Sequence, residues 1–140
     1  MRHSGLEVPR IWSGAAVLVG LLGGCGSNSD DIPACSEASV TLAVSDEARP
    51  VFTWTPVCGA AALFVRPGDG VGATWWIQTL NSANSLEPGI AYGVLPEGAG
   101  TNEPPLPLVD GREYQVSLLI ITQVPGGQEV REAGATTFVK

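Results

Sequence analysis

Three cysteine thiols are the side chains of this chain best suited to covalent chemistry. Cys25 directly follows Leu22-Gly23-Gly24, and Cys35 and Cys58 lie further along. A thiol can be acylated, can be oxidised to a disulfide or can act as a nucleophile, and its surroundings decide between these fates. The residues around each cysteine therefore come first.

The residues before Cys25 predict a signal peptide. Arg2 and Arg10 give a basic start, and the apolar run that follows, Ile11–Leu22, is about a dozen residues long, as in signal-peptide cores. A membrane-spanning helix needs about twenty. Gly23-Gly24 supplies the small side chains that a signal peptidase requires near its cut. We therefore expect residues 1–24 to be removed on export.

Leu22-Gly23-Gly24-Cys25 resembles the lipobox of bacterial lipoproteins, a Leu three places before a Cys with small residues between. The resemblance implies that the Cys25 thiol receives a diacylglyceryl group and that Cys25 becomes the first residue. Two or three acyl chains would make the membrane attachment lasting. The implied location is the bacterial cell envelope, on the periplasmic side or at the outer membrane. An ordinary secretory peptide with an incidental cysteine, or a short uncleaved anchor, are the alternatives.

Histidine is absent after this processing, because His3 is the only one in the sequence. That excludes His-based acid–base catalysis, Ser-His and Cys-His nucleophile pairs, and most zinc sites. Most carboxylates fall in predicted turns, where a charged side chain is usually only solvated: Asp69, Glu87, Glu97, Glu103, Asp110, Glu129 and Glu132. We therefore expect no enzyme, no catalytic residue, no cofactor and no metal.

Charge and length limit the partners and the domain count. Removing Arg2, Arg10 and Glu7 changes the net charge from -7 to -8, and no basic run remains, so nucleic acid is not an expected partner. The remaining length suits a single domain. Because Gly26 to Pro33 is small, polar and acidic, we expect residues 25–34 to be a flexible tether and residues 35–140 the folded domain.

Cys35 and Cys58 remain as an even pair if Cys25 carries lipid. In an oxidising compartment the default for such a pair is a disulfide. A redox role is not favoured, because the two are not in Cys-x-x-Cys spacing. Two free buried thiols are the alternative, since sequence spacing alone does not show that their Cβ atoms meet.

Short runs typical of β-strands alternate with turn residues from Ser39 onward, without helical periodicity. The expected strands are residues 39–44, 51–57, 61–65, 74–80, 90–95, 114–124 and 135–139. The stretch 96–107 is an expected exposed loop, because its prolines cannot donate to a strand ladder. We expect a hairpin turn at residues 125–128. These features predict an all-β fold, a seven-stranded antiparallel β-sandwich of two sheets.

Two motifs make this sandwich similar to fibronectin type III domains. Trp54-Thr55-Pro56 resembles their early core strand, and residues 108–118 resemble their Leu-x-Pro-Gly-x-x-Tyr-x-Val-x-Val stretch, with Asp110 where Pro is usual. The resemblance implies that Tyr114 hydrogen bonds back to the preceding turn. Residues 86–94 fit the same motif, so Tyr92 is the alternative. We prefer Tyr114, because only its strand is long enough to pair with a closing strand.

Trp75 and Trp76 are adjacent, so on a strand they point to opposite faces. We expect Trp75 in the core and Trp76 outward, where an indole could stack on a sugar or anchor a protein. Alternatively, Trp76 lies under the loop 96–107. Leu119 and Ile121 are also apolar and point away from the core-facing side of their strand, so either neighbouring loops cover them or they form an interface patch. We expect a lipid-anchored envelope module that binds protein or acts as a spacer; the alternative is carbohydrate or peptidoglycan binding through Trp76.

Overall fold

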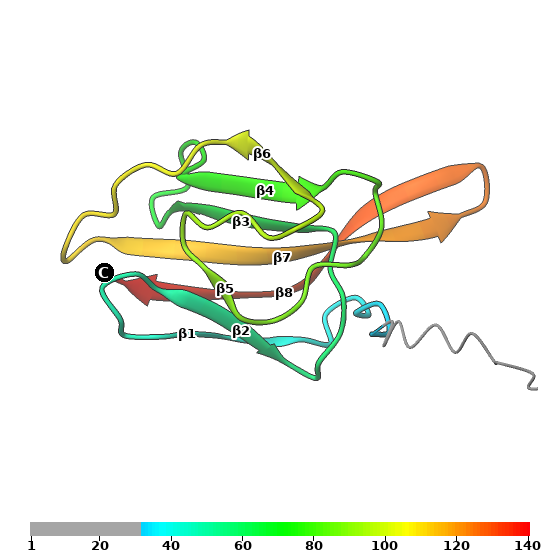
Figure 1. Cartoon of the computed structure of the whole chain (residues 1–140), viewed down its shortest axis with the longest axis horizontal. Helices are drawn as coiled ribbons and strands as arrows, with labels where there is room; N and C mark the ends of the chain where they lie inside the picture. Colours follow the sequence, from blue (N-terminus) through cyan, green and yellow to red (C-terminus); the bar gives the residue numbers. More distant parts are fainter. Residues whose placement is uncertain (1–31) are drawn as a thin grey trace, which may run out of the picture.

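Two antiparallel sheets pack face to face in a sandwich-like arrangement (Figure 1). The structure, a computed structural model, describes residues 32–140; the expected signal peptide and Cys25 lie outside this range. The strands are β1 (Thr41–Val44), β2 (Val51–Thr55), β3 (Ala62–Pro67), β4 (Trp75–Thr79), β5 (Ile90–Ala91), β6 (Ala99–Glu103), β7 (Glu113–Val124) and β8 (Gly127–Val139). Their orders are β1-β2-β5 and β6-β4-β3-β7-β8. Within the described range, no helix has the length and apolar character needed to cross a bilayer.

Alternating burial along the strands builds the core between the sheets. In β2, Phe52 and Trp54 are buried whereas Thr53 and Thr55 are exposed. The larger sheet contributes its own fully buried side chains, among them Leu63, Val65, Trp75, Ile77, Tyr114, Val116 and Leu118. Each large apolar side chain stabilises the fold by about 1.5–3 kcal/mol when buried. The expected all-β, two-sheet architecture is therefore confirmed.

The strand count is eight rather than the expected seven, because β6 lies inside the stretch expected to be an irregular loop. Pro96 and Pro104 flank this strand and do not interrupt it. It pairs only with β4, at the edge of the larger sheet, and most of its side chains are exposed. An edge strand that buries so little needs no hydrophobic alternation, so its sequence does not reveal it.

Strand β8 also begins earlier than expected, at Gly127 rather than Ala135. Together β7 and β8 form a long hairpin whose tip extends beyond the body of the sandwich (Figure 1). The first half of β8 is mostly exposed and includes Gln128, Glu129 and Arg131. Because this part of the hairpin stands in solvent, it lacks the apolar pattern by which a strand is recognised. The expected turn lies at its tip, with Gly126 at a positive φ of 90°.

The domain has two distinct ends (Figure 1). We call the end at which the described chain begins, which also has the β7–β8 hairpin tip, the N-terminal end. The opposite end, with Lys140, the β1–β2 loop and the β6–β7 loop, is the C-terminal end. Elements at both ends come from distant parts of the chain.

At the N-terminal end, backbone pairing starts before the first strand. The Cys35 N–H donates to the Gly59 carbonyl at 2.8 Å, and the Gly59 N–H donates to the Pro33 carbonyl at 2.8 Å. Pro33, inside the range expected for the tether, therefore contacts the domain. Cys35 and Cys58 are buried and form the expected disulfide, with their Cα atoms 4.8 Å apart.

At the C-terminal end, Tyr114 makes the expected corner. Its buried side chain accepts a hydrogen bond at Oη from the Val109 N–H, over 2.8 Å. This bond holds the turn that leads into β7. Tyr92 makes a different contact, described below.

Candidate binding surfaces

Trp76 lies on the outer face of the larger sheet, as expected. Its neighbour Trp75 is 1% exposed and belongs to the core. Trp76 is half-buried because Phe64, its partner across β3 and β4, packs edge-on against it with ring centroids 5.6 Å apart. The Trp76 Nε1 is buried and donates no hydrogen bond to any residue in 32–140. The indole is therefore held by aromatic packing and not by a polar contact.

Further apolar side chains extend this surface along β7 and β8. Leu119 and Ile121 are half-buried, Val130 is 67% exposed, and all three line a hollow beside Trp76. We call Phe64, Trp76, Leu119, Ile121 and Val130 the outer-face patch. The hollow measures about 100 Å³, whereas small-molecule pockets usually measure about 300–1,000 Å³. The hollow is therefore too small to be a ligand pocket of the usual size.

A larger and more open cleft lies at the C-terminal end, with a volume of about 420 Å³. We call it the Tyr92 cleft. Its lining comes from the β1–β2 loop, the turn after β5, the β6–β7 loop and the end of the chain. The lining residues are Ala48, Arg49, Pro50, Tyr92, Gly93, Pro105, Leu106, Pro107, Leu108 and Lys140.

Tyr92 is the centre of this cleft. Its hydroxyl donates to the Leu106 carbonyl at 2.6 Å, and its ring meets the buried Trp75 edge-on with centroids 5.1 Å apart. Burial, helped by nearby Tyr114, raises the pKa of Tyr92 to about 12. Tyr92 is therefore neutral at physiological pH, and it fixes the β6–β7 loop to the core.

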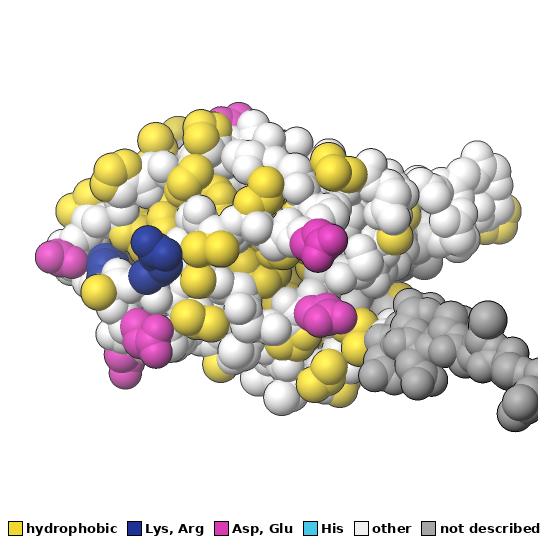
Figure 2. Space-filling view, in the orientation of Figure 1, with side chains coloured by type: hydrophobic (Ala, Val, Ile, Leu, Met, Phe, Trp, Pro, Cys, Tyr) yellow, Lys and Arg dark blue, Asp and Glu magenta, His cyan; other side chains and the backbone are white. Residues whose placement is uncertain are grey.

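The basic side chains of the described range differ in their polar partners. Arg112 pairs with Asp69 at 3.3 Å, and Arg66 hydrogen bonds to Gln115. Like Arg66, neither Arg49 nor Lys140 forms an ion pair with a described residue; the Lys140 Nζ donates only to the Ala48 carbonyl, at 2.8 Å. Both line the Tyr92 cleft. Figure 2 shows the basic side chains visible on this face among hydrophobic ones, with acidic side chains beside them, near the end where the C-terminus lies.

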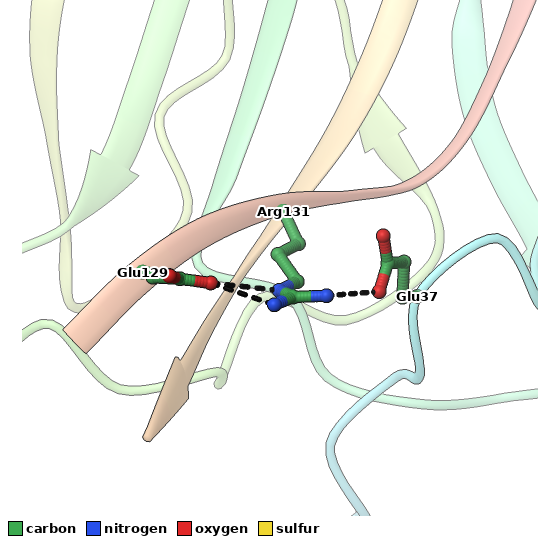
Figure 3. Close-up of polar contacts among 3 residues, drawn as sticks. All are labelled: Glu37, Glu129 and Arg131. Atoms are coloured by element: carbon green, nitrogen blue, oxygen red, sulfur yellow. Dashed lines mark hydrogen bonds and ion pairs between the residues drawn. The ribbon is translucent and has the colours of Figure 1, made fainter. Parts of the chain in front are cut away.

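Arg131 shows the opposite arrangement at the N-terminal end (Figure 3). Its guanidinium contacts Glu37, in the segment before β1, at 2.6 Å and Glu129, on the hairpin, at 2.7 Å. These hydrogen bonds, that of Glu37 foremost, raise the pKa of Arg131 further above its usual range. Its charge is thus already neutralised by two carboxylates.

A third hollow, of about 540 Å³, lies between the segments 85–91 and 94–98. Its charged lining residues are Glu87 and Glu97, with no basic side chain among them. Over residues 32–140, no three or more His, Cys, Asp or Glu side chains gather closely enough to hold a metal ion. This hollow combines two carboxylates with apolar side chains such as Leu86 and Ile90.

Comparison with protein families, with curated proteins and with solved structures gives no match for this chain. Among the candidate residues, Trp76 lies in the outer-face patch and Cys25 lies outside the described range. The Tyr92 cleft was not anticipated. Only one sequence feature pointed toward it, the corner-like motif that contains Tyr92; Arg49 and Lys140 gave no indication.

Proposed function

We propose that the protein is a lipid-anchored, non-enzymatic module of the bacterial cell envelope that binds another protein. The observation that carries this proposal is the Cys35–Cys58 disulfide close behind the lipobox-like Leu22-Gly23-Gly24-Cys25. Disulfides persist in oxidising compartments outside the cytoplasm, which agrees with export. With Cys35 and Cys58 joined, Cys25 is the cysteine left for lipid.

The particular type of sandwich belongs to the same proposal. The three-stranded sheet β1-β2-β5, the neighbouring order β4-β3-β7-β8 and the Tyr114 hydrogen bond support a fibronectin type III-like domain. Strand β6 is an addition to the seven strands of that pattern. Such domains serve mainly as adaptors and spacers, but the fold alone implies no ligand.

The position of the Tyr92 cleft favours binding of a partner over a purely spacing role. The cleft lies at the C-terminal end, opposite the end where the chain enters the domain (Figure 1). In a protein anchored through Cys25, this is the end farther from the point where the chain enters the domain (Figure 1). A partner in the envelope could therefore reach the cleft without competing with the lipid surface.

The anchor is tested by the substitution Cys25→Ser. We expect the variant to be released from membranes or to accumulate with its signal peptide, whereas Ser29→Ala, a matched change in the tether, should remain membrane-bound. Membrane fractionation and intact-mass measurement of both proteins decide this. A Cys25→Ser protein that stays in the membrane at its mature mass would contradict the proposal.

Glycan binding through Trp76 is the second candidate, favoured by one observation. The Trp76 ring is partly exposed and its Nε1 has no acceptor within residues 32–140, which leaves a donor for a sugar hydroxyl if the side chain shifts. Titration with peptidoglycan fragments should then change tryptophan fluorescence, and Trp76→Ala should abolish the change. An unchanged spectrum across a broad glycan panel would eliminate this candidate.

A further inference from the structure

We infer that the Tyr92 cleft binds a short peptide segment in which a carboxylate lies next to an apolar side chain. The inference rests on the proposed binding function and names the class of partner. Its support comes from the construction of the cleft, from its lining and from its charge.

The cleft is held in shape by hydrogen bonds between its walls. The Tyr92 N–H donates to the Pro50 carbonyl at 2.8 Å, and the Tyr92 hydroxyl donates to the Leu106 carbonyl at 2.6 Å. The Lys140 Nζ donates to the Ala48 carbonyl and so joins the end of the chain to the β1–β2 loop. Because these four segments are already joined by hydrogen bonds, a ligand would lose little affinity to ordering them.

The lining mixes apolar and polar surface. It includes three prolines and two leucines, of which Leu106 is 54% exposed, together with the basic Arg49 and Lys140. A water-exposed leucine in a cleft gains from being covered by an apolar group. The volume of about 420 Å³ lies within the usual range for ligand sites and accommodates one or two side chains.

The charge requirement follows from Arg49 and Lys140. Without its expected signal peptide the chain has a net charge of -8, yet these two cations have no carboxylate partner among the described residues. An arginine guanidinium presents donors that match a carboxylate in a bidentate pair. The cleft therefore combines a site for one anionic group with a site for an apolar side chain.

Nearby acidic residues restrict the direction of approach. Asp46 and Glu47 line a separate hollow that shares only Pro50 and Lys140 with the Tyr92 cleft. A ligand carboxylate would be repelled on that side, so Arg49 is its preferred partner. We place the apolar side chain of the peptide against Tyr92 and Leu106, which do not line the hollow that contains these acids.

The test uses the full-length matured protein, labelled with ¹⁵N, in detergent micelles. The probes are synthetic hexapeptides with one Glu beside Leu or Val, each matched by a peptide with Gln in place of Glu. We expect the Glu peptides to shift the amide signals of Gly93, Leu106 and Lys140. Arg49→Gln should weaken binding about fivefold, whereas Arg131→Gln, which removes an equal charge at the other end, should leave it unchanged.

Three results would overturn the inference. The first is no shift of the amide signals at millimolar peptide, and the second is equal affinity for the Glu and Gln peptides. The third is an affinity of the Arg49→Gln variant equal to that of the unaltered protein. Shifts of the same signals with protein concentration alone would also overturn it, in favour of self-association. Its failure is distinct from failure of the proposed function. If Cys25 is acylated but the cleft binds no peptide, only the inference fails. If the protein is not membrane-anchored but binds the acidic peptides, only the proposed anchor fails.

Discussion

The two ends of this domain differ in how completely their charged side chains are paired. At the N-terminal end, Cys58 is bonded to Cys35 and Arg131 is neutralised by Glu37 and Glu129. At the C-terminal end, hydrogen bonds from Tyr92 and Lys140 keep a cleft in shape while Arg49 stays without an ion pair among the described residues. The N-terminal end is closed by these contacts, whereas at the C-terminal end Arg112 pairs with Asp69 and Arg49 is the side chain that we propose contacts a ligand.

Asn84 makes further hydrogen bonds that stabilise the N-terminal end. Its Nδ2 donates to the Ile121 carbonyl and its Oδ1 accepts from the Ile121 N–H, both over 2.8 Å. Strand β3 pairs with β7 only as far as Leu119, so the Asn84 amide takes the place of the missing strand at the next edge position. Unpaired strand edges invite pairing with other chains, and this contact covers one of them.

The largest effect is expected from removal of the disulfide. The pair Cys35→Ser and Cys58→Ser opens a covalent loop of sequence separation 23, which should lower the free energy of unfolding by about 3 kcal/mol. Urea unfolding followed by tryptophan fluorescence measures the change. Cys25→Ser serves as the control and should unfold as the unaltered protein does. A double variant of undiminished stability would mean that the N-terminal end does not depend on its covalent link.

A smaller effect is expected from Asn84→Ala. The change removes two hydrogen bonds to the Ile121 backbone and should cost about 1–3 kcal/mol. Hydrogen exchange of the Ile121 amide should accelerate, while amides in the middle of β7 should change much less. Asn102→Ala, on the exposed edge strand β6, is the matched control. Equal exchange rates at Ile121 in both variants would show that the Asn84 contact is not maintained in solution.

The smallest effect on the free energy of unfolding is expected from Tyr92→Phe at the C-terminal end, and it appears only at high pH. Tyr92 has a pKa of about 12 in the folded chain against 10.0 as its ordinary value, so the folded state retains the proton longer than the unfolded state. The resulting stabilisation is complete below about pH 10 and is lost as the pH rises toward about 12. Tyr92→Phe should weaken this decline in the free energy of unfolding. If the two proteins declined in parallel between about pH 9 and 11, Tyr92 would not be the group responsible.

Burial explains which elements could be predicted from sequence. Strands β2, β4 and β7 each have alternating buried and less buried positions, and all three were anticipated close to their observed ranges. The cysteine pairing and the Tyr114 corner were also correct. Strand β6 and the outer half of β8 were missed because both lie largely in solvent, where no apolar periodicity is required.

The Tyr92 cleft could not be predicted for a different reason. Pro50, Tyr92 and Leu106 are far apart in sequence and meet only because β2 pairs with β5 and the β6–β7 loop folds back on Tyr92. No local spacing encodes this meeting. Trp76 was the visible candidate because two adjacent tryptophans are conspicuous, although its hollow is the smaller of the two.

The link between Cys35 and Cys58 also determines how the domain would respond to mechanical tension. A pull applied to the start of the chain passes through the sulfur atoms directly to Cys58, at the entry to β3. Residues 36–57, which include β1 and β2, lie inside the covalent loop, so their backbone is not in the direct path of that tension. While the bond is intact, tension on the start of the chain cannot straighten this segment, and the covalent path continues at β3 of the larger sheet.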